Sequence, residues 1–294
     1  MTDPYASHPT QARIHLDHLT HNMSLLQELV GDAQLWPAIK ANAYGHDARV
    51  IARHLVARGH DTLCVSYPQE AVELLESGVR ARFLVMAPSL PEQSECIVAH
   101  DLEPVVCTTE ALASLGHAAA RAGRTLAVHV KVDTGMGRVG IRPEEVPDFL
   151  ARCREHEALR VKGLMSHFAR AGEADKRFSQ EQIEAFEHVR SATGGAGIAF
   201  HHFANSAAVF DLPESHLDAA RPGIAIYGLR PSDTLRNPRV SELRPVLEWC
   251  TRITFLKEVP AGTGLSYSHE FRATRPTLVA TLPLGYGDGL TRRL

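Results

Sequence analysis

Residues 62–86, TLCVSYPQEAVELLESGVRARFLVM, decide the fold because two apolar runs flank one amphipathic segment. The runs TLCVSY (62–67) and RFLVM (82–86) have the length and apolar character of buried strands. Between them, PQEAVELLESG (68–78) opens on proline and closes on glycine, as helices commonly do. The stretch therefore predicts two parallel strands joined by a right-handed helical crossover.

The same unit recurs along most of the chain. The other candidate strands are LWPAI (35–39), EPVV (103–106), TLAVHVKV (125–132), VKGLMSH (161–167), IAFHHFA (198–204) and LDAARPGIAIYG (217–228). The last is the least regular, since Pro222 cannot donate to a strand ladder. Helical patterns also cover 47–59, 109–123 and 179–192. Eight strands favour a TIM (β/α)8 barrel over a doubly wound sheet, and we assign residues 11–240 to it.

The pattern changes from about residue 241. WCTRITFLKEV (249–259), the turn AGTG (261–264) and TLVATLPLGYGDG (277–289) indicate antiparallel β structure. Residues 241–294 are therefore predicted to be the first part of a C-terminal β domain. That segment is short for an independent β domain.

Composition excludes several classes of protein. A net charge of −3 gives no basic surplus for nucleic acid. The five cysteines are scattered and never spaced as CxxC, and the 17 histidines form no HExxH motif, so we expect neither disulfides nor a metal site. The sequence also shows no signal peptide and no apolar run long enough to span a membrane. These features favour a cytoplasmic protein that acts on small molecules.

Candidate site residues follow the apolar runs, because the active sites of such barrels lie at the carboxyl ends of the strands. They are Lys40, Arg138, His167, Asn205, Ser206, Arg221 and Gly223. The apolar flanks of Lys40 favour the neutral amine that imine chemistry needs, although a lysine reaching out to solvent would give the same pattern. Ser206 and Gly223 suit a phosphate group or a plain turn. Arg138 could equally be a surface arginine.

Longer motifs carry a resemblance along essentially the whole chain. They are AIKANAYGH (38–46), KVDTGMGRVG (131–140), GLMSHFA (163–169), HFANSAA (202–208), RPGIAIYG (221–228), SYSHEF (266–271) and LPLGYGDGLTRRL (282–294). Together they resemble the bacterial alanine racemases, fold-type III enzymes that use pyridoxal 5'-phosphate (PLP). The resemblance implies racemisation of L-alanine and D-alanine, which supplies D-alanine for peptidoglycan.

The resemblance also implies two catalytic bases. Lys40 would bind PLP as a Schiff base and serve as the base on the D-alanine side. Tyr267 would be the base for L-alanine, contributed by the partner subunit of a homodimer with shared active sites. Two bases on opposite faces are what inversion requires.

Other roles are implied by position. Residues matching phosphate-side contacts are Tyr44, Ser206, Gly223 and Ile224, and Asn205 and His167 are added to the cofactor-binding set. Arg138 matches the residue that binds the phenolic oxygen and the substrate carboxylate, and Lys131 matches a lysine that some relatives carbamylate. Arg221 would face the pyridine nitrogen and leave it unprotonated, which favours racemisation over transamination. His167 would hydrogen-bond Arg221 and link it towards Tyr267.

One departure bears on activity. The family's chain continues beyond LPLGYGDGLTRRL into a Met-Asp segment and a late phosphate-binding tyrosine, so we expect this sequence to be truncated at Leu294. Two alternatives stay open, namely a weakly active or non-catalytic PLP-binding fragment and a racemase of another small amino acid such as serine. A decarboxylase would need an acidic residue at the pyridine nitrogen, and Arg221 argues against it.

Overall fold

The computed structural model describes residues 8–194 and 197–291; Leu294, the expected point of truncation, lies outside them. The chain forms two compact units, Leu16–Val246 and a smaller unit of Met1–His15 with Leu247–Leu294. Strand β1 (Gln11–Ile14) pairs antiparallel with β10 (Leu247–Cys250) in the smaller unit. The domain boundaries expected from the sequence therefore differ from these units at the N-terminus and near residue 246. Periodicity could not reveal this pairing, because the two strands are far apart in sequence.

The larger unit contains eight parallel strands in the order β2-β9-β8-β7-β6-β5-β4-β3. These are β2 (Gln34–Leu35), β3 (Thr62–Val65), β4 (Arg82–Val85), β5 (Glu103–Val106), β6 (Leu126–Lys131), β7 (Leu159–Met165), β8 (Phe200–His202) and β9 (Ala219–Ala220). A parallel bridge between Ala38 and Cys64 joins the two end strands. There the Cys64 N–H donates to Pro37 O at 2.9 Å, and the Ile39 N–H donates to Cys64 O at 2.9 Å. The sheet thus closes into the predicted TIM barrel.

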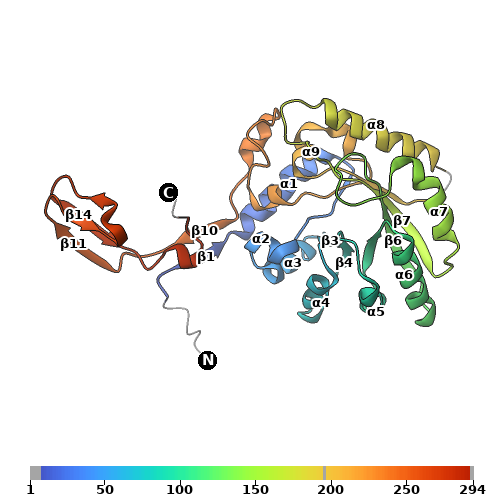
Figure 1. The fold of residues 1–294 in the computed structure, drawn as a ribbon, viewed down its shortest axis with the longest axis horizontal. Helices are drawn as coiled ribbons and strands as arrows, with labels where there is room; N and C mark the ends of the chain where they lie inside the picture. Colours follow the sequence, from blue (N-terminus) through green and yellow to red (C-terminus); the bar gives the residue numbers. More distant parts are fainter. Residues whose placement is uncertain (1–7, 195–196, 292–294) are drawn as a thin grey trace. The chain divides into compact units, whose positions relative to one another are not determined.

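Helices lie outside the strands of this unit (Figure 1). They are α1 (Leu16–Val30), α3 (Ala48–Val56), α4 (Pro68–Glu76), α5 (Ser94–Ala99), α6 (Thr109–Arg121), α7 (Val146–Arg154), α8 (Arg177–Ala192) and α9 (Ser206–Asp211). Local signals fix their starts: the Thr108 hydroxyl accepts from the Ala111 N–H before α6, and Pro68 opens α4. No helix among the described residues is long and apolar enough to cross a membrane.

Apolar side chains from most of the strands form a core cluster inside the barrel. This cluster comprises Trp36, Ala38, Cys64, Leu84, Val105, Met165 and Ala219, with Met86 and Phe200 packed against it. Trp36 is 1% exposed and packs edge-on against Phe200. These side chains form a packed core inside the barrel.

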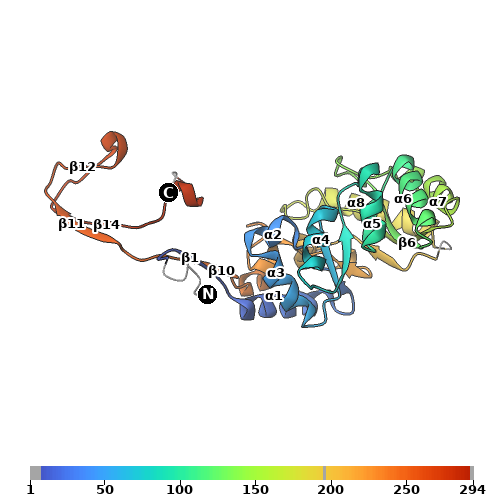
Figure 2. The same ribbon diagram turned by 90° about the horizontal axis from the view of Figure 1, so that it is seen from below.

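The smaller unit is antiparallel, as expected. Strands β11 (Phe255–Val259) and β14 (Thr277–Thr281) pair antiparallel and are seen edge-on in Figure 2. Between them in sequence, β12 (Gly264–Leu265) pairs with β13 (Phe271–Arg272). Many of its large apolar side chains are exposed, including Phe255, Leu256, Phe271 and Leu278.

Candidate active site

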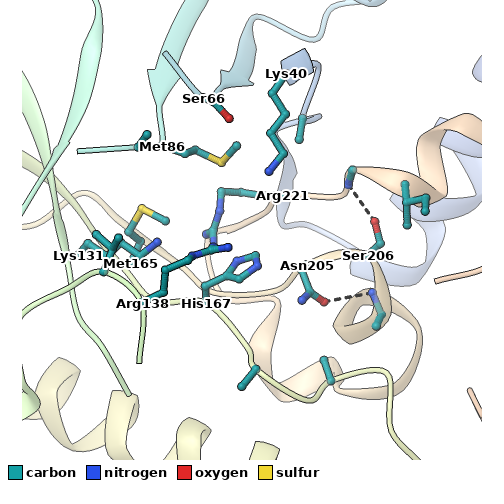
Figure 3. Close-up of a pocket in the computed structure, with 18 of the residues that line it drawn as sticks. Lys40, Ser66, Met86, Lys131, Arg138, Met165, His167, Asn205, Ser206 and Arg221 are labelled. Carbon is teal, nitrogen blue, oxygen red and sulfur yellow. Dashed lines mark hydrogen bonds between the residues drawn. The ribbon is translucent and has the colours of Figure 1, made fainter. Parts of the chain in front are cut away.

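A cavity of about 600 Å³ opens at the carboxyl ends of the barrel strands. Its lining includes Lys40, Tyr44, Lys131, Arg138, His167, Asn205, Ser206, Arg221, Gly223 and Ile224. Figure 3 shows the labelled members projecting into the same space from different strand ends. The strand-end rule therefore brings together every predicted site residue of the larger unit.

Tyr267 is the one predicted site residue outside this cavity. It belongs to the smaller unit, where its side chain is 81% exposed. Ser266, Ser268 and His269 around it all have positive φ angles. The tyrosine is thus displayed on a tight, irregular segment rather than packed as the buried strand aromatic that the sequence also allowed.

Lys40 begins a turn of unusual handedness. The segment Lys40–Gly45, labelled α2, has φ angles of 51–54° from Ala41 to Tyr44, so it winds left-handed. Residues other than glycine resist this conformation by roughly 1–2 kcal/mol each. The Glu70 carboxylate stabilises the turn, accepting from the Ala41 N–H at 2.5 Å and, at its other oxygen, from the Ser66 N–H at 2.6 Å. The turn directs the Lys40 side chain towards Arg221 (Figure 3).

Ser206 and Gly223 build the part of the cavity wall beside this turn. The Ser206 hydroxyl oxygen accepts from the backbone N–H of Gly223 at 2.8 Å and of Ala225 at 3.2 Å. A Cβ on Gly223 would lie 2.4 Å from the Tyr44 hydroxyl oxygen, so a larger residue there would have to displace Tyr44 or the backbone. Asn205 has a structural role as well, because its side-chain oxygen caps α9 by accepting from Ala207 and Ala208.

Four basic side chains line the cavity together, namely Lys40, Lys131, Arg138 and Arg221. Burial, together with the charges of Arg221 and Arg138, lowers the pKa of Lys131 to about 8. Burial also lowers the pKa of Arg221 to about 10, which leaves the guanidinium charged at neutral pH. Such a group of cations suits a ligand that carries several negative charges.

The hydrogen bond expected between His167 and Arg221 is wrong. Arg221 Nη1 instead donates to His202 Nδ1 at 2.7 Å, and Nη2 donates to the Ser166 carbonyl at 2.7 Å. Burial and the Arg221 charge hold the pKa of His167 well below its usual value, so the ring is neutral beside the cation. His167 follows β7, whereas His202 is the last residue of β8 and faces inwards.

Sequence reasoning missed His202 as a partner of Arg221. It also missed His129 and Glu103, which continue the hydrogen bonding from His202 into the barrel interior. One signal was present: adjacent strand residues point to opposite sides, so one of His201 and His202 had to face the interior. A glutamate at the start of the apolar run EPVV was a second.

The site combines a lysine amine with fixed cations and backbone N–H groups. The amine can form an imine with a carbonyl compound, and the cations and N–H groups can bind phosphate and carboxylate oxygens. No group of three or more metal-ligating side chains occurs within residues 8–194 and 197–291. This arrangement fits an anionic carbonyl ligand held covalently at Lys40.

Comparison with known proteins gives consistent matches over nearly the whole chain. The sequence model of the alanine racemase N-terminal domain matches residues 14–231, and that of the C-terminal domain matches residues 246–294. Alanine racemase of Halothermothrix orenii is 42% identical over 289 residues, which are 97% of this chain and 76% of that protein. The enzyme of Carboxydothermus hydrogenoformans is 38% identical and covers 97% of this chain and 78% of its own length.

Solved structures agree with the sequence matches. Alanine racemase from Clostridium difficile 630 superposes with a TM-score of 0.91 at 34% identity, covering 97% of this chain and 75% of that one. The enzyme from Streptomyces coelicolor A3(2) also gives 0.91 at 34% identity and covers 99% of this chain and 78% of its own. This chain therefore spans about three quarters of the length of these relatives.

Proposed function

We propose that this chain, which belongs to the alanine racemase family, interconverts L-alanine and D-alanine with PLP as its cofactor. The activity is that of an isomerase acting on amino acids. The observation that carries the cofactor assignment is the placement of Lys40 in one cavity with Arg138, Arg221 and the Ser206–Gly223 backbone contact. A D-alanine product would serve peptidoglycan synthesis.

The residues present fit the proposed cofactor. The buried Nε of Arg221 has no hydrogen-bond partner among the described residues, so it is a donor that a bound acceptor would satisfy. The Ser206 hydroxyl, which accepts from the Gly223 and Ala225 N–H groups, lines the cavity together with Tyr44 and Ile224, where these groups can contact a phosphate. When bound, PLP supplies a carbonyl for Lys40 and a conjugated ring that draws electron density from the Cα–H bond of the substrate.

The chain's own residues would divide the remaining work. Arg138 binds the substrate carboxylate and sets its orientation, while Ser206, Gly223, Ile224 and Tyr44 bind the phosphate. Lys40 holds or releases the Cα proton on one face of the substrate, and Tyr267 does so on the other. Arg221 keeps its proton and so does not protonate the pyridine nitrogen, which limits charge delocalisation and favours prompt return of the proton.

The proposed base Tyr267 implies a second copy of the chain. Its exposed side chain and the exposed apolar residues of the smaller unit support a homodimer in which each subunit supplies Tyr267 to its partner.

The five cysteines are all free, which supports the proposal of a reducing, cytoplasmic location.

Covalent trapping at Lys40 tests the proposal. With PLP present, borohydride reduction should attach the cofactor to Lys40, and peptide mass spectrometry should find it there. Lys40→Ala should lose both the adduct and racemisation, measured as loss of optical rotation from L-alanine. The exposed lysine of β11 gives a matched control, Lys257→Ala, which should retain both. Adduct at another lysine would overturn the assignment, and adduct without racemisation would support a binding-only protein.

A further inference from the structure

A chain of buried polar side chains crosses the barrel interior from Arg221 to the far end of β5. Arg221 Nη1 meets His202 Nδ1 at 2.7 Å, and His202 Nε2 meets His129 Nδ1 at 2.9 Å. His129 Nε2 meets Glu103 Oε2 at 3.0 Å, and Lys162 Nζ hydrogen-bonds the other carboxylate oxygen of Glu103. All five side chains belong to residues that are 7% exposed or less.

The donors and acceptors at the two ends of this row of side chains fix the direction of every hydrogen bond within it. Arg221 can only donate, so His202 Nδ1 must accept and its proton must sit on Nε2. His129 then accepts at Nδ1 and donates from Nε2 to Glu103. Burial lowers the pKa of both imidazoles, well below the usual value for His202, so both rings are neutral. Each ring thus accepts towards Arg221 and donates towards Glu103.

Glu103 is the only member that accepts on both sides. Arg221 and Lys162 are donors at the two ends, and each imidazole accepts one proton and donates one. A carboxylate satisfies His129 with one oxygen and Lys162 with the other. A neutral amide offers only one oxygen, so an amide at this position leaves one pair of donors facing each other.

The backbone makes room for this chain. The pairing of β6 with β7 shifts register between Val128 and His129. A Cβ on Gly163, across from His129 on β7, would lie 2.1 Å from His129 Nδ1. Trp36 packs edge-on against both rings, with centroids 5.9 Å from His129 and 4.8 Å from His202. The rings are therefore held in place from several sides, so a donor mismatch cannot be relieved by rotating them into solvent.

We propose that Glu103 is a positioning residue for Arg221: through His129 and His202 it keeps the ring nitrogen that meets the guanidinium an acceptor. The charge and position of Arg221 in the cavity then depend on a carboxylate at the opposite end of the barrel. The effect on racemisation rests on the proposed function, whereas the hydrogen-bond chain itself does not.

The test uses Glu103→Gln and a readout that needs no cofactor. Lys162 attracts the amide oxygen, so the amide NH2 turns to His129 and both rings must exchange their acceptor and donor nitrogens. Nitrogen-15 NMR of histidine-labelled protein should therefore show the proton of His202 moving to Nδ1. With PLP bound, kcat should fall about tenfold with a smaller change in KM, as for one lost hydrogen bond at the site.

A second substitution provides a rescue. Adding Lys162→Met to Glu103→Gln removes the competing cation, so the amide oxygen can return to His129. The double variant should recover the wild-type ring signals and most of the lost kcat. Lys176→Met is the matched control, because it breaks another little-exposed ion pair, between Lys176 and Asp211 at 2.9 Å. That pair has no hydrogen bond to Arg221, His202, His129, Glu103 or Lys162. It should lower the melting temperature and leave the His202 signals unchanged.

Three results would overturn the proposal. In the wild type, a proton on His202 Nδ1 would contradict the deduced direction, and this measurement needs no variant to fold. In Glu103→Gln, unchanged ring signals and kcat with a lowered melting temperature would mean that Glu103 serves only its local ion pair. The same conclusion would follow if Lys176→Met changed the His202 signals as much as Glu103→Gln does. A wild-type chain without racemase activity would refute the proposed function but leave the NMR result decisive.

Discussion

Gly223 faces the Tyr44 hydroxyl so closely that a single added carbon would displace it. Gly223→Ala should move Tyr44 or the backbone N–H groups that Ser206 anchors, and so weaken PLP binding about tenfold. Affinity for pyridoxal, which lacks the phosphate, should change less. Fluorescence titration with the two compounds measures the difference.

A control glycine shows whether the effect is local. Gly287→Ala adds the same carbon where nothing lies within 4 Å, so its affinities should match the wild type. Equal weakening of PLP and pyridoxal binding by Gly223→Ala would argue against a phosphate contact at this end of the cavity.

Glu103 should make stability depend on acid pH. Burial alone raises the pKa of its carboxyl, but hydrogen bonds from His129 and Lys162 outweigh burial and lower the pKa to about 2. Because the folded pKa lies below the unfolded value of about 4.3, the carboxylate stabilises the fold above that pH and loses this effect as pH falls towards 2. The contribution is of order 3 kcal/mol.

Glu103→Gln cannot titrate, so its free energy of unfolding should fall less steeply than that of the wild type between about pH 4.5 and pH 2. Denaturant unfolding at a series of pH values measures the two slopes. Parallel curves would show that the folded carboxyl has an ordinary pKa.

For single residues, the sequence predicted which side chains would line the same cavity, but not which of them would form hydrogen bonds with each other. Lys40, Arg138 and His167 could be placed at one barrel mouth because each follows an apolar run. The partner of Arg221 could not be chosen between His167 and His202, since strand position fixes the side of the sheet and not the hydrogen bond. For the same reason, the sequence could not show that Glu103 hydrogen-bonds His129.

The left-handed turn after Lys40 is the element on which the candidate site most depends. It has four positive φ angles, and its Ala41 N–H converges with the N–H groups of Ser66 and Tyr67 on the Glu70 carboxylate. Glu70→Ala should lower the free energy of unfolding by about 1–3 kcal/mol. It should also slow adduct formation at Lys40, because the turn no longer directs the amine.

Denaturant unfolding and the rate of borohydride trapping measure these two effects. The neighbouring Glu73→Ala removes an exposed carboxylate from the same helix α4 and should change neither. Equal effects of the two substitutions would mean that the helix charge, rather than the contact with the turn, is responsible.

Strands and helices were largely predictable, and this turn was not. The strands β3 to β7 fall within or close to the apolar runs from which they were predicted, because buried parallel strands are apolar along their whole length. The turn has no comparable signal: alanine, asparagine and tyrosine adopt positive φ here only because Glu70 and the barrel wall stabilise them. A tertiary contact overrides local preference in this element.

At the scale of the whole molecule, the proposed exchange of Tyr267 makes each active site depend on two chains. Lys40→Ala and Tyr267→Phe chains should each be inactive as homodimers. Mixed and allowed to exchange, they should form heterodimers with one intact site, giving about a quarter of wild-type activity for random pairing. Optical rotation measures the recovery, and sedimentation velocity the dimer.

Mixtures that stay inactive while heterodimers form would place both bases in the same chain or exclude Tyr267 as a base.

The division of the chain into a barrel and a β unit was predictable from the change in periodicity near residue 241. The pairing of β1 with β10 was not predictable, because the sequence of a short N-terminal strand does not indicate which distant strand it pairs with.

The pairing of β2 with β9 sets the order in which a working protein can be made. Leu35 lies beside Ala220, so the lysine that follows β2 and the arginine that follows β9 meet only when nearly the whole barrel has been synthesised. Contacts between such distant segments form late, because the intervening chain must be ordered first. A nascent chain that ends before β9 therefore lacks Arg221 and Gly223, so the proposed PLP site can form only after β9 has been synthesised.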